Sequence, residues 1–185
     1  ASPSPLVTST PYNACFNSDV TISVPDAGTG ANYNWNGDIV NQNSNTIISN
    51  SNIPGFKSYS VTVTSAQGCS SSGFGSHIVN APINTTITAT PNPACFGTTI
   101  SLSIPEAAST TVSWAGSGIN NTTGFSTTAT PTQAGLQTYT VTATTNAYFG
   151  NCTFTGTVDV MVESTLPSCS ISGSTAVCPA AMTTY

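Results

Sequence analysis

The side chains of this chain that could do chemistry are six cysteines, one histidine, six acids and a single lysine. His77 is the only imidazole, and no Asp or Glu lies near it in the sequence to orient it as a catalytic base. We expect His77 to be a solvent-facing strand residue. The acids are scattered singly, whereas glycosidases need a facing pair of carboxyl groups. No catalytic residue is predicted, so we do not expect an enzyme.

Metal binding has little support in the sequence. A zinc site needs closely spaced cysteine pairs that converge on one ion, and the closest spacing is that of Cys169 and Cys178. Calcium takes six to eight oxygen ligands, usually with several carboxylates, and no carboxylate cluster occurs. We predict no metal ligands and no cofactor.

The six cysteines therefore indicate disulfides. Disulfides persist in oxidising surroundings, which predicts an extracellular or cell-surface location.

Charged residues make up only 4% of the 185 residues, the net charge is −5, and Lys57 is the only cation of the Lys/Arg type. Nucleic-acid binding needs clustered cations, and so does a polybasic membrane anchor. No apolar run approaches the roughly 18 residues that span a bilayer. We therefore expect neither nucleic-acid partners nor membrane insertion.

A repeat organises the chain. Ala14-Cys15-Phe16 recurs as Ala94-Cys95-Phe96 at an offset of 80, and Tyr59 and Val61 recur at the same offset. Trp35 corresponds to Trp114, and Cys69 to Cys152 after a short insertion. The separation from Cys69 to Cys95 equals that from Cys152 to Cys178, so Cys178 marks a further copy. We predict repeats at 1–82 and 83–165, and the start of a third at 166–185.

Apolar and hydroxyl residues alternate within each repeat, as in Val20-Thr21-Ile22-Ser23-Val24. This period of two is typical of strands with one buried face, and no stretch has a helical period. The predicted fold is all-β, with tandem immunoglobulin-like sandwiches. Strands are expected near 5–10, 19–25, 31–36, 45–49, 57–64 and 74–80, and near 84–90, 98–105, 110–115, 125–130, 137–144 and 153–162.

Each repeat carries Cys-Phe before an alternating strand, then Trp-x-Gly, then Gly-x₃-Tyr-x-Val-Thr and a final cysteine. This pattern resembles the immunoglobulin-like and PKD-like repeats of Bacteroidota surface adhesins exported by type IX secretion, such as the gliding-motility adhesin of flavobacteria. The segment from Cys169 to Cys178 looks like the opening of a PKD-like unit. The resemblance implies a stalk segment of a long adhesin or surface filament, whose partners are neighbouring repeats.

Two disulfide patterns are open. One closes each repeat on itself, as Cys15–Cys69 and Cys95–Cys152. In an immunoglobulin-like sandwich, however, a cysteine before the second of these strands and one after the fifth lie at opposite ends, whereas a disulfide needs Cα atoms within about 7 Å. This geometry favours pairs across the junctions. Those pairs would be Cys15–Cys152 and Cys95–Cys169, with the partners of Cys69 and Cys178 outside this sequence.

Aromatic residues fall into two classes. Trp35 and Trp114 lie on the third strand, where this fold buries a Trp between its sheets. Tyr148 and Phe149 lie in a longer loop and are the candidates for a contact surface. An alternative function is therefore a carbohydrate- or surface-binding module, with polysaccharide as its partner. The uncharged faces also favour lateral self-association.

Overall fold

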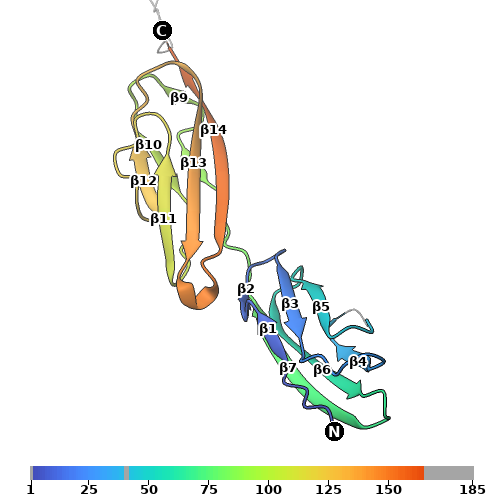
Figure 1. Cartoon of the computed structure of the whole chain (residues 1–185). Coiled ribbons are helices and arrows are strands. Elements are labelled where there is room, and N and C mark those ends of the chain that lie inside the picture. Colours follow the sequence, from blue (N-terminus) through green and yellow to red (C-terminus); the bar gives the residue numbers. More distant parts are fainter. Residues whose placement is uncertain (1, 40–41, 165–185) are drawn as a thin grey trace, which may run out of the picture.

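The structure is a computed structural model that describes residues 2–39 and 42–164. These residues form two β-sandwich units joined end to end, with the N-terminus at the outer end of the first unit (Figure 1). The strands of unit one are β1 (Thr8–Thr10), β2 (Asn13–Ala14), β3 (Asp19–Ser23), β4 (Asn32–Gly37), β5 (Thr46–Asn50), β6 (Gly55–Thr64) and β7 (Ser70–Val79). The elements of unit two are β8 (Thr88–Thr90), β9 (Ala94–Cys95), β10 (Ile100–Ser103), β11 (Thr110–Ala115), β12 (Ser126–Ala129), β13 (Gly135–Thr145), the 3₁₀ helix η1 (Ala147–Phe149) and β14 (Thr153–Glu163).

Both units have the same two-sheet topology. Unit one pairs β1-β3-β5 in one sheet and β2-β7-β6-β4 in the other. Unit two pairs β8-β10-β12 and β9-β14-β13-β11 in the equivalent orders. The architecture is the predicted all-β arrangement of immunoglobulin-like sandwiches, and the strands lie close to the expected ranges.

The alternating sequences place one face of each sheet in a core and the hydroxyl face toward water. In β3, Val20 and Ile22 are fully buried between the sheets. Thr is β-branched and suits a strand while remaining polar, so an almost uncharged surface can stay hydrated. The buried clusters of the two units share no residue, and each unit therefore has its own core.

Trp35 in β4 and Trp114 in β11 lie in these cores. Each indole N–H donates to a backbone carbonyl, that of Ser44 at 2.8 Å and that of Gly124 at 2.7 Å. These bonds satisfy the polar end of a ring that is otherwise buried among apolar groups.

Two short strands were not predicted. β2 and β9 each have two residues and pair in parallel with the last strand of their unit. They place Ala14 and Ala94 in the core, and the cysteine that follows each alanine lies at the C-terminal end of its unit.

The expectation for His77 was wrong. His77 is fully buried in β7, and neither ring nitrogen has a hydrogen-bond partner among the described residues. Its ring lies 5.8 Å from that of Tyr59, measured between centroids. Loss of contact with water lowers the pKa of His77, because burial disfavours the charged imidazolium, and nearby Lys57 lowers it further.

Candidate functional site at the junction of the two units

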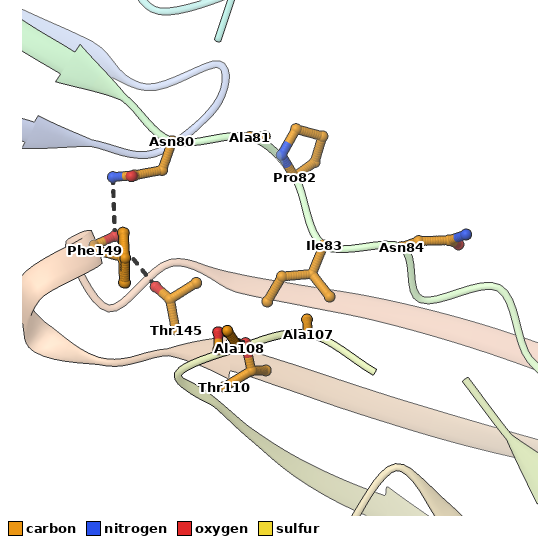
Figure 2. Close-up of a pocket in the computed structure, with 10 residues that line it drawn as sticks. All are labelled: Asn80, Ala81, Pro82, Ile83, Asn84, Ala107, Ala108, Thr110, Thr145 and Phe149. Carbon is orange, nitrogen blue, oxygen red and sulfur yellow. Dashed lines mark hydrogen bonds between the residues drawn. The ribbon is translucent and has the colours of Figure 1, made fainter. Parts of the chain in front are cut away.

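The segment that joins the units, residues 80–84, is short and held at both ends. Pro82 fixes its own φ and restricts Ala81 to extended backbone. Ile83 packs against the core of unit two, and Figure 2 shows its side chain directed toward Ala107 and Ala108. The connection therefore differs from a flexible Gly/Ser linker.

The turn between β13 and β14 forms the other side of the junction. The N–H of Thr145 donates to the carbonyl of Cys152 at 2.9 Å and closes the turn, which encloses η1. Asn146 caps η1 by accepting a hydrogen bond from the N–H of Phe149 at 3.3 Å. The hydroxyl of Thr145 accepts from the N–H of Cys152 at 2.8 Å. These bonds fix the position of Cys152 in the turn.

A disulfide between Cys15 and Cys152 crosses the junction. The Cα atoms are 5.4 Å apart, and the two residues are separated by 137 positions in the sequence. Cys152 is buried, whereas Cys15 is half-buried and follows β2. This is the inter-unit pair that the strand directions favoured, and the structure excludes the Cys15–Cys69 alternative.

The remaining cysteines do not meet one another within the described residues. Cys69 is exposed in the turn between β6 and β7, at the N-terminal end of unit one, and Cys95 is half-buried as the last residue of β9. Neither makes a disulfide within residues 2–39 and 42–164. The expected pair Cys95–Cys169 and the partner of Cys178 involve positions outside the described residues.

Asn80 links the units by hydrogen bonds. Its side-chain amide donates to the carbonyl of Ala14 at 3.2 Å and to that of Phe149 at 3.1 Å. Figure 2 shows the second bond, together with the bond from the hydroxyl of Thr145 to the same carbonyl, at 3.2 Å. One side chain therefore holds β2 of unit one and η1 of unit two together.

Gly150 permits the close approach of the two units. Its φ of 79° is in the left-handed region, which favours glycine. A Cβ atom built at Gly150 would lie 2.5 Å from the backbone oxygen of Asn13, inside van der Waals contact. Any other residue here would displace β2 from the turn.

A cavity of about 320 Å³ lies beside this junction. Its walls are neutral, with small apolar side chains, amides and hydroxyls, and Phe149 at one end (Figure 2). The residues that line it are Asn80, Ala81, Pro82, Ile83, Asn84, Ala107, Ala108, Thr110, Thr145 and Phe149. The set includes no carboxylate, imidazole, amine or thiol, so no side chain of the kind that acts as a general acid or base lines the cavity.

The two predicted contact residues differ in role. Tyr148 is exposed on η1, and its ring meets that of Phe149 edge to face at 5.1 Å between centroids. Phe149 is half-buried and contributes its carbonyl to the junction. Asn80 and Gly150 were missed by the sequence analysis. Their roles depend on which turn meets which strand, and residue type alone does not show that.

Two further observations concern metal ions and membranes. Within residues 2–39 and 42–164, no group of three or more His, Cys, Asp or Glu side chains is placed to hold a metal ion. No helix of the described part of the chain is long and apolar enough to cross a membrane.

Comparisons with known proteins give similarity of architecture only. No protein-family model matches the chain, and no curated protein matches its sequence. Solved structures similar to it include carbohydrate-binding modules of the β-sandwich superfamily, with a TM-score of 0.39 and 16% identity over 77% of this chain. The chain spans 54% of the length of that structure.

Two other solved structures match over their full length. Murine CEACAM1b has a TM-score of 0.38 and 9% identity over 86% of this chain and 100% of its own. The fibronectin(III)-like modules of Clostridium thermocellum CbhA have a TM-score of 0.37 and 11% identity over 91% of this chain and 100% of their own. No functional conclusion follows from similarities at this level.

Proposed function

We propose that this chain is a non-catalytic structural segment of an extracellular surface protein, a stalk or filament in which covalent bonds hold consecutive sandwiches in a fixed orientation. The observation that carries the proposal is the Cys15–Cys152 disulfide between two units that each have a separate core. The bond is not needed to close either sandwich, so its effect falls on the orientation of one unit relative to the other.

The mechanical argument rests on the number of connections. A single connecting segment would let the units bend and twist about it, as is the default for domains with a small interface. Here the segment 80–84 is one connection and the disulfide is a second. Two connections at separate places suppress rotation about either one, and Asn80 adds a hydrogen bond between them.

A junction held by a disulfide suits an extracellular, oxidising environment. Disulfides persist outside the cell and bind no ion, so the junction keeps its stiffness when the calcium concentration varies.

The repeated motifs resemble those of Bacteroidota adhesins exported by type IX secretion, which supports a place in a long surface adhesin or filament. The uncharged Ser, Thr and Asn faces offer little electrostatic resistance to neighbouring chains, which supports lateral association.

Small-angle scattering of the oxidised chain tests the proposal. We expect a well-defined maximum dimension for the wild type and a broad distribution of inter-unit distances for the double variant C15S/C152S. The variant C69S is the matched control, because Cys69 is exposed and unpaired within the described residues, and its scattering should equal that of the wild type. If C15S/C152S scattered like the wild type, the disulfide would not determine the orientation of the units.

A further inference from the structure

The outer face of the four-stranded sheet in unit one carries an exposed aromatic ring among polar side chains. Phe74 in β7 is 80% exposed, although it lies in the middle of a regular strand. The strand register places Ser60 opposite Phe74 and Asn36 opposite Ser60, so the three side chains form a row across β7, β6 and β4. An aromatic ring in such a place gains nothing for the fold, because its surface stays in water.

An open depression of about 360 Å³ lies beside this ring. The residues around it are Asn36, Gly37, Ser58, Tyr59, Ser60 and Phe74. Its outward side chains are one amide, two hydroxyls and one ring. Asp38 lies at the edge, where its carboxylate accepts the N–H of Ser58 at 3.1 Å.

The polar groups of the depression are free to bind. In the neighbouring rows of the same sheet the hydroxyls pair with each other, Thr62 with Ser72 at 3.1 Å and Thr64 with Ser70 at 2.9 Å. The side chains of Asn36, Ser58 and Ser60 make no hydrogen bond to any of the described residues. An amide offers two donors and an acceptor, and each hydroxyl offers both functions.

We infer that this face of unit one is a binding site for a neutral polysaccharide, with a sugar ring stacked on Phe74 and its hydroxyls bonded to Asn36, Ser58 and Ser60. A pyranose has an apolar C–H face and a rim of hydroxyls, which is the combination that an aromatic wall with a few convergent polar groups recognises. The uncharged side chains on the row itself favour an uncharged ligand. The inference does not depend on the stalk function, because the site lies within one unit.

A second copy of the chain is a poorer occupant for this face. A stable protein interface buries about 1,600 Å² and has an apolar centre. Phe74 is instead flanked on its own strand by Ser72 and Ser76, and the row of Ser58 and Ser76 separates it from the exposed Phe56 on the same face. The ring therefore does not lie at the centre of a continuous apolar patch.

Unit two lacks the same groups. Its register places Ala115 where unit one has Asn36, and Thr157 where unit one has Phe74. The chain should therefore hold one such site, in unit one, and unit two is an internal control.

Affinity electrophoresis through gels that contain barley mixed-linkage glucan, galactomannan or arabinoxylan tests the inference, with alginate as an anionic polysaccharide. We expect at least one neutral polysaccharide to retard the wild type, and F74A to weaken the binding about tenfold, as expected for a ring that dominates its contact. F74Y should keep the binding within about threefold, because the ring is retained. N36A should weaken it less than F74A does.

T157A, at the equivalent exposed position of unit two, is the matched control and should bind like the wild type. F74A should also unfold like the wild type, since the ring is exposed. The inference is overturned if no neutral polysaccharide retards the wild type, if F74A is retarded equally, or if alginate alone binds. Sedimentation of the wild type and of F74A tests for a second copy of the chain on this face. If the wild type self-associates and F74A does not, a second copy is the occupant and the saccharide site is overturned.

Discussion

The two units share their strands but differ in one hairpin turn. In unit one the turn closes with the N–H of Ser65 bonded to the carbonyl of Cys69 at 2.9 Å, and in unit two Thr145 and Cys152 form the equivalent bond at the same distance. Unit two has three more residues between these positions, and they form η1. Cys152 is consequently buried against unit one, whereas Cys69 is exposed at the far end. The strands bring a turn to the end of a sandwich, and the content of the turn determines what that end contacts.

A second difference lies in the cores. The register of β6 with β7 and of β13 with β14 places His77 of unit one at the position of Val160 in unit two. Both are fully buried. The same place in one fold therefore holds a titratable ring in one unit and an aliphatic side chain in the other, so the units should respond differently to pH.

Deletion of Ala147–Phe149 should have the largest effect, because it shortens the turn of unit two to the length of that in unit one. Without η1 the carbonyl of Phe149 no longer meets Asn80, and Cys152 is drawn away from Cys15. We expect the Cys15–Cys152 bond to fail to form. Peptide mapping without reduction would detect the loss of the cross-linked peptide.

The variant Y148A is the control for this deletion. It keeps the length of the turn and removes only an exposed ring, so its disulfide should form as in the wild type. Recovery of the Cys15–Cys152 peptide from the deletion variant would show that η1 is not what positions Cys152.

The variant H77V should stabilise unit one by about 1–2 kcal/mol at pH 7, because it removes two buried nitrogens without partners, partly offset by the smaller volume of Val. Burial lowers the pKa of His77 in the folded unit, with Lys57 acting in the same direction and Asp38 opposing it. The unfolded chain, with an ordinary pKa of about 6.5, takes up its proton first as the pH falls. Stability should therefore decline below about pH 6.5 in the wild type and less so in H77V.

Urea denaturation followed by Trp35 fluorescence, in a background carrying W114F, measures unit one alone. In the converse variant V160H, the stability of unit two should decline with falling pH in the same way. Trp114 fluorescence measures this in a background carrying W35F. Equal pH profiles for the wild type and H77V would mean that the burial of His77 does not govern the acid sensitivity of unit one.

The strand positions and the arrangement of two sandwiches could be predicted because alternation with a period of two reports directly which face is buried. The pairing of Cys15 with Cys152 could be favoured for a similar reason, since the direction of each strand determines the end at which its turn lies. β2 and β9 escaped prediction because two residues are too few to show a period, and their parallel pairing depends on the last strand of each unit.

His77 shows why alternation fails where both faces carry apolar residues. In β7, Phe74 and Ile78 share one face, and His77 and Val79 share the other. The prediction that His77 faces solvent would bury the opposite face, which carries Phe74, but the structure buries the face with His77 and exposes Phe74. The partner strand decides the matter, because Tyr59, Val61 and Val63 of β6 all face the core and set the phase of β7.

The variant G150A tests the close approach of the two units and should cost more than about 1 kcal/mol in the stability of the junction. Its matched control is G68A in the shorter turn of unit one. Gly68 has a φ of 83°, close to the 79° of Gly150, but a Cβ there would meet no atom within 4 Å. Both variants carry the same backbone strain, and G150A alone adds the contact with Asn13.

The rate at which dithiothreitol reduces the Cys15–Cys152 bond reports the difference. We expect faster reduction in G150A than in G68A, because displacement of β2 exposes Cys152 to the reagent. Equal rates in the two variants would show that the approach of Gly150 to Asn13 contributes nothing to the junction.

The variant N80D should have the smallest effect. Asp is nearly the same size as Asn but has no N–H to donate, so the bonds to the carbonyls of Ala14 and Phe149 are lost and a carboxylate faces two carbonyl oxygens. The disulfide should still form, since it holds the same two segments covalently. The lost hydrogen bonds should weaken the association of the two units by about 1 kcal/mol, and this loss should become measurable only when the disulfide is reduced. Under reducing conditions, small-angle scattering of N80D should therefore give a broader distribution of inter-unit distances than that of the reduced wild type. The two oxidised proteins should give the same distribution. A broad distribution in oxidised N80D would mean that the amide, and not the sulfur bridge, sets the orientation of the units.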